Sequence, residues 1–257
     1  MSMPTIIADV SSGVVSVTFY NGDNKIASGS AFLSGGKIVS NNHVFHPVEG
    51  DFAPNTIVRL MVSDSRFIFQ YSELTKYVIS GSTVDNHDYI LLDISTPNFF
   101  DGKFQFELGT HDDMSVGEQI LIMGYPFEHE NLTSHLGHVS AKYIEGDVNV
   151  IQLDASVNNG NSGGPLIDPS TKKVIGIVTR KATGLAIQFD ELIRSFDSNV
   201  EVLQKLQGLA WGKLTIGEIF ATSQRQMKEI ARNIKRSANV GIGYAFSCNK
   251  LKEENSL

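Results

Sequence analysis

Three observations on the sequence predict an all-β protein that carries a helical insertion near its C-terminus. Short runs of β-branched and aromatic residues follow one another from residue 14 to residue 178, each bounded by Gly, Asn, Asp or Ser. A joint at 94–103, with a proline and an Asp-Gly pair, divides these runs into two series. After residue 189 the apolar residues recur instead at every third or fourth position, as on a helix. Strands at this spacing are typical of a barrel or a sandwich.

The expected strands fall on both sides of the joint. The first series comprises the runs at 14–20, 30–33, 37–40, 56–62, 67–69 and 89–92. The second comprises the runs at 119–123, 136–140, 148–153, 174–178 and 240–246. We therefore divide the chain into a first β unit at 1–103 and a second at 104–189 plus 238–250, with the helical insertion at 190–237.

Two amphipathic helices are the simplest explanation of the insertion. The recurring positions are Phe189, Ile193, Phe196, Val200 and Leu203, and then Phe220, Met227, Ile230, Ala231 and Ile234. Either the helices cover one face of a β unit, or they form an arm that binds a second copy of the chain or a regulatory partner. The sequence alone leaves both interpretations open.

The composition excludes several classes of protein. The net charge is −7 without any long basic run, so the surface does not favour binding to nucleic acid. Cys248 is the only cysteine, so no intramolecular disulfide can form, which suits a reducing compartment. Residues 1–20 lack the pattern of a signal peptide, and no run of 18 apolar residues occurs. We expect a soluble cytoplasmic protein without membrane contact.

The most informative stretch is GNSGGPL at 160–166. Ser162 has glycines close on both sides and follows an Asn-rich turn, so its hydroxyl would project from a tight bend. Small neighbours would also let a substrate carbonyl reach backbone N–H groups, which a nucleophile with an oxyanion hole requires. The alternative is a glycine-rich turn without any chemical role.

The same residues satisfy G-x-S-x-G, the nucleophile elbow of α/β-hydrolases. In that fold the catalytic histidine follows the serine along the chain. All seven histidines here precede Ser162, and strands do not alternate with helices. The elbow is therefore excluded, whereas the chain order His, Asp, Ser remains allowed.

A general base and an orienting acid must accompany the serine. His43 follows a strand through a short turn, and His46, which precedes a proline, is its rival. Asp88 stands directly before a buried run, whereas Asp85 lies in a turn and Asp93 leaves the far end of the run. Position alone favours His43 and Asp88 modestly and leaves the rivals open.

A metal centre is the other chemistry to weigh. His129, His135 and His138 lie near Glu128 and Glu130. Their spacing matches no helical metal motif, so we expect neither a metal nor a cofactor.

Five blocks of sequence, in order, resemble the trypsin-like serine proteases, and most closely their HtrA/Deg branch. They are SGSAFL at 28–33, IVSNNHV at 38–44, HDYILLDI at 87–94, MGYP at 123–126 and QLDASVNNGNSGGPL at 152–166. The resemblance covers roughly residues 10–180, with a final strand at 240–246. HtrA proteins usually carry a PDZ domain after the protease, but only 57 residues follow Val200 here.

The resemblance implies two perpendicular six-stranded antiparallel barrels with the active site in the cleft between them. His43 would be the base, Asp88 the residue that orients it, and Ser162 the nucleophile that attacks a polypeptide substrate. The backbone N–H groups of Gly160 and Ser162 would bind the oxyanion. A protease fold that is latent and acts as a binding or chaperone module is the alternative.

The resemblance also places the primary specificity pocket. Ser156 would lie near its base, and Thr179 and Arg180 would follow the strand that forms its wall. A small neutral residue at the base argues against Arg or Lys before the scissile bond. We expect a preference for small or aliphatic residues.

Overall fold

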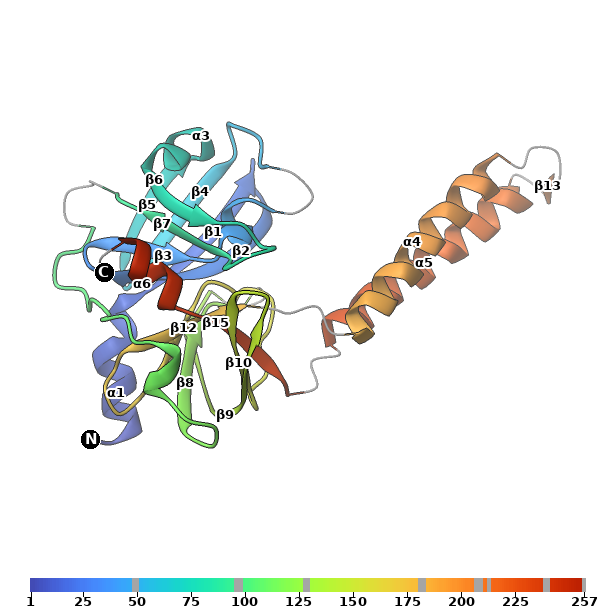
Figure 1. Ribbon diagram of the computed structural model, residues 1–257. Coiled ribbons are helices and arrows are strands. Elements are labelled where there is room, and N and C mark those ends of the chain that lie inside the picture. The colour runs from blue at the N-terminus through green and yellow to red at the C-terminus, as the bar shows by residue number, and fades with distance from the viewer. Residues whose placement is uncertain are drawn as a thin grey trace. The chain divides into compact units, whose positions relative to one another are not determined.

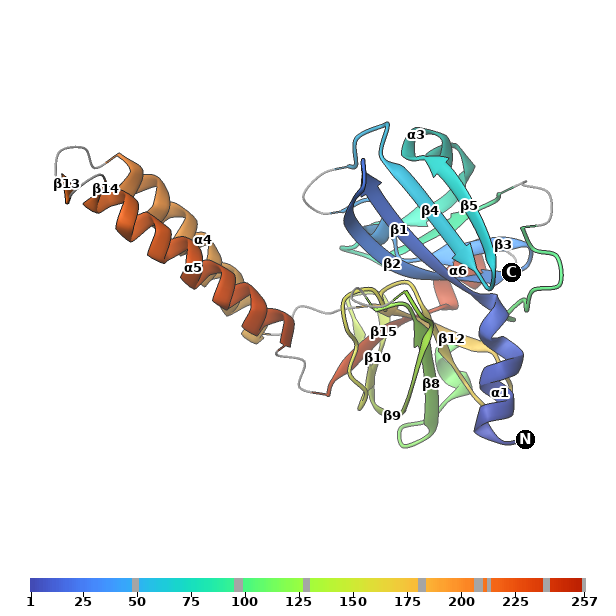
Figure 2. The ribbon, with the colours of Figure 1, turned by 180° about the vertical axis from the view of Figure 1, so that it is seen from behind.

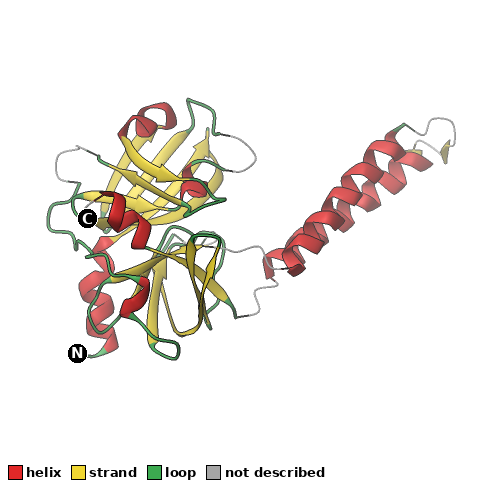
Figure 3. Ribbon diagram, in the orientation of Figure 1, coloured by secondary structure: helices red, strands yellow, loops and turns green. Residues whose placement is uncertain are grey.

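The computed structural model describes residues 1–47, 51–94, 99–126, 130–179, 184–205, 210–211, 214–237 and 241–255. The chain forms two compact units, one of Met1–Arg180 with Gly241–Leu257 and the other of Lys181–Val240. Strands make up most of the first unit and two long helices most of the second (Figure 3). Among the described residues, no helix is both long and apolar enough to span a membrane.

The N-terminal half of the first unit is an antiparallel sheet in the order β5-β4-β1-β2-β3-β7-β6. Its strands are β1 (Val14–Asn21), β2 (Asn24–Ser34), β3 (Lys37–Ser40), β4 (Ile57–Val62), β5 (Ser65–Gln70), β6 (Val78–Ser82) and β7 (Tyr89–Leu92). It has seven strands where six were expected. The additional strand is β6, whose Ser-Gly-Ser end has low β propensity, and which is held by pairing with the buried β7.

The second half is a closed six-stranded barrel in the order β10-β15-β12-β11-β8-β9, as expected. Its strands are β8 (Gln119–Gly124), β9 (Thr133–Glu145), β10 (Val148–Leu153), β11 (Pro165–Ile167), β12 (Val174–Thr179) and β15 (Gly243–Ser247). β15 pairs with both β10 and β12, so a strand from beyond the helical insertion closes the barrel. β11 has three residues, too few for an alternating pattern to be visible in the sequence.

Both ends of the chain form helices that the sequence did not predict. They are α1 (Met3–Val10) and α6 (Asn249–Asn255), and both contact the region between the two β halves (Figures 1 and 2). Ile6 of α1 and Leu251 of α6 share one apolar cluster with Phe32 of the first sheet and Leu121 of the barrel. Cys248 is buried in the same cluster as a free thiol, so apolar packing joins the two halves where no disulfide can.

Short helical turns complete the first unit. They are η1 (Ser11–Gly13), α2 (Asn42–Phe45), α3 (Tyr71–Leu74), η2 (Thr75–Tyr77) and η3 (His111–Asp113). The turn α2 matters for the site because it begins two residues after β3 and carries a histidine.

The second unit is a helical hairpin of α4 (Gly184–Gln204) and α5 (Ile216–Ser237). In the segment that connects the two helices, β13 (Ala210–Trp211) pairs with β14 (Leu214–Thr215) as a two-stranded antiparallel sheet. α4 begins before residue 190, where the insertion was expected to start, because the four-residue apolar step extends back to Leu185. Asn199 donates to Gln224 at 3.1 Å and Lys228 to Asp197, which bring the helices together side by side.

Candidate active site

The site is organised around a buried carboxylate. Asp88 has no exposed surface and directly precedes β7, whose four residues are all buried. Asn41 Nδ2 donates to the Asp88 carbonyl at 2.8 Å, and the Asp88 N–H donates to the Thr83 carbonyl at 3.0 Å. Its φ is 46°, in the left-handed region that non-glycine residues seldom adopt. Such a conformation persists only where the surrounding contacts enforce it.

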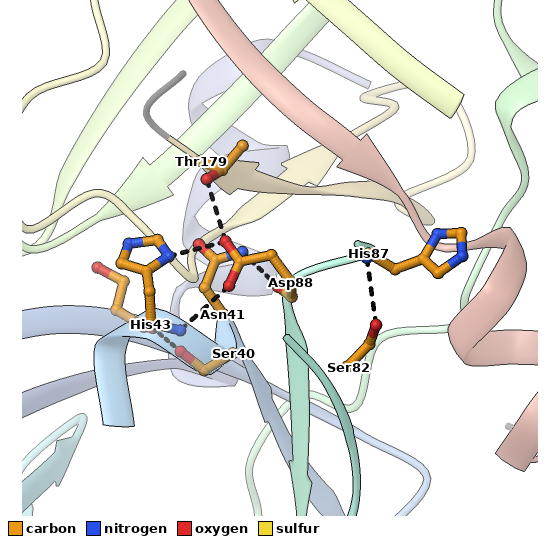
Figure 4. A network of polar contacts seen from close by, with 8 residues as sticks. Ser40, Asn41, His43, Ser82, His87, Asp88 and Thr179 are labelled. Carbon is orange, nitrogen blue, oxygen red and sulfur yellow. Dashed lines mark hydrogen bonds and ion pairs between the residues drawn. The ribbon is translucent and has the colours of Figure 1, made fainter. Parts of the chain in front are cut away.

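His43 is held by both oxygens of this carboxylate. The ring Nδ1 lies 2.7 Å from Asp88 Oδ2, and the His43 backbone N–H donates to Asp88 Oδ1 at 3.1 Å (Figure 4). Thr179 Oγ1 donates to Oδ2 at 3.3 Å. The His43 side chain keeps 26% of its surface exposed. With Nδ1–H bonded to a carboxylate, Nε2 is the ring nitrogen that can accept a proton.

The rival residues lie elsewhere in the structure. His46 Nδ1 lies 3.0 Å from Asp51 Oδ1 and 3.1 Å from the Tyr71 hydroxyl. Asp85 and Asp93 are exposed. Among these candidates, the structure therefore pairs His43 with Asp88.

Ser162 lies in the loop between β10 and β11, in a bend that requires glycine. The φ of Gly163 is 85°, and a Cβ there would lie 2.1 Å from the Ser30 carbonyl oxygen. A Cβ on Gly164 would lie 2.4 Å from the Met123 carbonyl oxygen. Ser162 itself is buried, with 8% of its surface exposed.

Ser30 of β2, which the sequence did not identify as a site residue, connects this loop to the first sheet. Its N–H donates to the Ser162 carbonyl at 2.8 Å, and its Oγ donates to the Gly160 carbonyl at 2.6 Å. The same Oγ accepts from the Tyr125 N–H at 2.8 Å, and Ser40 Oγ donates to the Ser30 carbonyl at 2.7 Å. Ser30 has no exposed surface. The strand with the SGSAFL motif thus fixes the serine loop directly.

The N–H groups expected to bind an oxyanion lie at the turn. The φ of Gly160 is 98°, again a conformation suited to glycine. Among the described residues, the N–H groups of Gly160 and Ser162 donate to no other protein group. Between them, the buried side-chain amide of Asn161 has no hydrogen-bond partner on either polar atom.

The expected pocket residues are partly described. Ser156 is half-buried in the segment that leads from β10 to the serine loop. Thr179 ends β12 and is buried, with its hydroxyl directed at Asp88 (Figure 4). Arg180 lies outside the described residues.

The histidines weighed as metal ligands do not form a metal site in the part of the chain that is described. His138 Nδ1 lies 3.2 Å from Asp154 Oδ2, and its N–H also bonds to that carboxylate. This backbone hydrogen bond is the main cause that lowers the pKa of Asp154. No group of three metal-binding side chains occurs among the described residues, which do not include Glu128 and His129.

The sequence of this chain is similar to the sequences of known serine proteases. A family model described as the trypsin-like peptidase domain matches residues 27–177. A protein from Rickettsia conorii named as a DegP-like periplasmic serine endoprotease is 27% identical over 228 residues, which span 84% of this chain and 40% of that protein. The mitochondrial protease Do-like 4 of Arabidopsis thaliana is 29% identical over 174 residues, 64% of this chain and 28% of that protein. The chain thus spans less than half the length of these relatives.

Solved structures share the fold. The HtrA-type protease AlgW, solved with a tripeptide, aligns with 99% of this chain and 62% of its own at a TM-score of 0.59 and 21% identity. The structure of Deg5 aligns with 69% of this chain and 84% of its own at a TM-score of 0.54 and 25% identity. The arrangement of β units described above is therefore the one found in HtrA-type proteases.

Proposed function

This chain belongs to the trypsin-like peptidase family, and we propose that it is a serine endopeptidase of the HtrA/Deg type that cleaves polypeptides through His43, Asp88 and Ser162. The main support for the proposal is that both carboxylate oxygens of the buried Asp88 bond to His43, one to its ring Nδ1 and the other to its backbone N–H. The same sheet holds the Ser162 loop through Ser30. Neither a metal nor a cofactor has a part in this chemistry.

Each group has one role in the reaction. Ser162 Oγ attacks the peptide carbonyl while His43 Nε2 takes its proton, so a C–O bond forms and a tetrahedral intermediate results. The N–H groups of Gly160 and Ser162 stabilise the oxyanion of that intermediate. The imidazolium, stabilised by Asp88, then protonates the leaving amine as the C–N bond breaks. Water hydrolyses the acyl-enzyme by the same steps in reverse order.

Hydrolysis of an unfolded protein substrate tests this role. Ser162→Ala removes the nucleophile, and the rate is expected to fall by about a million-fold. Ser198→Ala, on the exposed surface of α4, is the matched control and should leave the rate unchanged. Equal rates for Ser162→Ala and the wild type would show that this serine is not the nucleophile.

The primary pocket is proposed at Ser156, Thr179 and Arg180. Because Ser156 supplies a small neutral group and no carboxylate, small or aliphatic residues are expected before the scissile bond. A peptide library with this position varied measures the preference. Strong cleavage after arginine would contradict the assignment of Ser156 to the pocket base.

A latent protease that binds unfolded chains is the second candidate. The buried side-chain amide of Asn161, between the two oxyanion donors, favours it, because this amide has no partner in the present arrangement and would gain stability if the turn rearranged to supply one. Suppression of aggregation by the wild type, without cleavage under any condition, would support this function over the first.

The proposed partner is a polypeptide substrate, and neither nucleic acid nor membrane is expected. A cytoplasmic location is proposed from the single cysteine, Cys248, which leaves no intramolecular disulfide to form. The relatives named above are periplasmic and mitochondrial, so they give this location no support. Fractionation of the native cell with an antibody against the chain measures the compartment directly.

A further inference from the structure

The helix α5 has two adjoining apolar faces. One face is made by small residues, with Gly217, Ala221 and Ala231 buried. Gln224 and Lys228 lie on this face and bond to α4, so this is the face against which α4 packs. The hairpin is therefore already closed along this face, and any apolar residues on another face of α5 are not needed to hold it together.

The second face is an exposed apolar stripe. It is formed by Ile219, Phe220, Met227, Ile230 and Ile234, each with between 46% and 54% of its surface exposed. Phe220, Met227 and Ile234 are spaced by seven residues, and Ile230 lies three residues after Met227, as at the core positions of a coiled coil. The stripe runs along about 22 Å of helix at 1.5 Å per residue. Such a narrow, regular seam matches another helix.

The described side chains that flank the stripe carry no charge. Gln226 lies on one side, and Gln224 and Ala231 lie on the other. Among the described side chains of α5, the charged ones lie on the opposite face, at Glu218, Arg225, Glu229 and Arg232, or bond to α4, as Lys228 does. In helical bundles, flanking charges select or reject partners. A seam with uncharged flanks meets an identical seam without repulsion between like charges.

We propose that the stripe is a dimerisation surface and that α5 packs against α5 of a second copy of this chain. A two-fold, antiparallel arrangement suits the sequence, because Met227 is the midpoint between Phe220 and Ile234. Met227 then packs against Met227 of the second copy, while each Phe220 meets an Ile234. The two hairpins together form a four-helix bundle.

The exposed area of the stripe determines how strongly two copies of the chain are expected to bind. Five large side chains that are each about half exposed contribute on the order of 80 Å² apiece, or about 800 Å² for two copies. This is below the roughly 1,200 Å² of a small stable interface before the flanking amides are added. We therefore expect a dimer that dissociates on dilution rather than a permanent one.

A membrane surface is the main competing occupant of an apolar helix face. Interfacial helices place Lys and Arg beside a broad apolar face, where they meet lipid headgroups. Among the described side chains, the flanks are amides and a small residue, and Arg225 and Arg232 lie on the far side of the helix. The seam consequently fits a helix better than it fits lipid.

Sedimentation velocity of the full chain across a range of concentrations tests the proposal. All proteins carry Ser162→Ala, so that self-cleavage is prevented and the outcome does not depend on the proposed catalysis. The stripe variant replaces Phe220, Met227 and Ile234 by Gln, and we expect its mass at high concentration to be half that of the unaltered stripe. A matched triple variant, with Gln at Glu218, Arg225 and Arg232, should keep the mass of the unaltered chain.

Disulfide crosslinking checks the geometry without disrupting the seam. Met227→Cys should form a covalent dimer on mild oxidation, whereas Arg225→Cys on the far side should not, and the buried Cys248 adds no background. A mass that is the same with and without the stripe residues, or equal crosslinking at both positions, would overturn the proposal. Cosedimentation of the chain with anionic vesicles, lost only in the stripe variant, would likewise replace it with a membrane contact.

Discussion

Ser30→Ala offers a specific test of how the two β halves build one site. The substitution removes only a hydroxyl, but that hydroxyl donates to the Gly160 carbonyl and accepts from the Tyr125 N–H. The Ser30 backbone remains, so its N–H still bonds to the Ser162 carbonyl. The variant therefore loosens the turn at 160–162, which holds the proposed oxyanion N–H groups, and leaves the strand that supports this turn in place.

The magnitude follows from the two groups that lose their partner. A buried polar group left unpaired destabilises the fold by about 1 to 3 kcal/mol, so for two groups we expect a loss of roughly 2 to 6 kcal/mol in the free energy of unfolding. If the Gly160 N–H no longer points at the oxyanion, kcat falls by about 100-fold or more, as for the loss of one oxyanion donor. KM should change little, because Ser30 is buried below the loop and has no exposed surface.

Urea unfolding and steady-state peptide hydrolysis measure the two effects. Ser28→Ala is the matched control, since this serine lies two residues earlier on β2 and its buried Oγ has no hydrogen-bond partner. It should leave both quantities near those of the wild type. A Ser30→Ala enzyme with wild-type kcat would refute the idea that Ser30 positions the turn.

Three further predictions follow from the site and the core. Asp88→Asn should keep the fold but lower kcat by about 10,000-fold in peptide hydrolysis, because an amide no longer fixes the tautomer of the base. Gly163→Ala should lower the free energy of unfolding in urea by on the order of 3 kcal/mol, since its φ is positive and its Cβ would collide with the Ser30 carbonyl. Burial and the nearby Asp51 carboxylate raise the pKa of Tyr71 to about 12. Its stabilising contribution is therefore complete below pH 10 and is lost between pH 10 and 12, because only the unfolded chain ionises in that range. After allowance for screening by solvent, the loss should be on the order of 2 kcal/mol, and Tyr71→Phe should lack it in alkaline unfolding curves.

The parts of the fold that the sequence predicted are those with strong local signals. The long runs that became β1, β4, β8 and β10 alternate or continue as apolar residues between turn residues. β6 and β11 were not predicted, because a Ser-Gly-Ser end and a three-residue strand after proline carry no pattern. Both exist through pairing with buried neighbours, which is a property of the folded sheet.

The two terminal helices were also not predicted from local sequence signals. Residues 3–10 were not distinguished from the strands that follow, and 249–255 resembled a polar tail. α1 contributes Met3, Ile6, Ile7 and Val10 to the cluster between the β halves, and α6 contributes Leu251. The helical spacing in α1 covers only two turns, which is shorter than the stretch in which a helical period can be recognised, and the burial of these residues depends on a surface that forms from distant strands.

The sequence predicted those residues of the candidate site that belong to motifs in a recognisable chain order. His43, Asp88 and Ser162 come from three sequence blocks, and the first two meet in the structure. The sequence did not predict the role of Ser30, because this role depends on contacts with residues about 95 and 130 positions away. The contact of Thr179 with Asp88 crosses from one β half to the other and has no local signal either.

Labelling with a fluorophosphonate probe, followed by mass spectrometry of the digested protein, tests the central claim most directly. The probe reacts with a serine only when a base activates its hydroxyl and an oxyanion site receives the phosphoryl oxygen. We predict a single modification at Ser162 in the wild type and none in His43→Ala, with intermediate labelling in Asp88→Asn. Modification of another serine, or labelling of Ser162 at an equal rate in His43→Ala, would contradict the proposed triad.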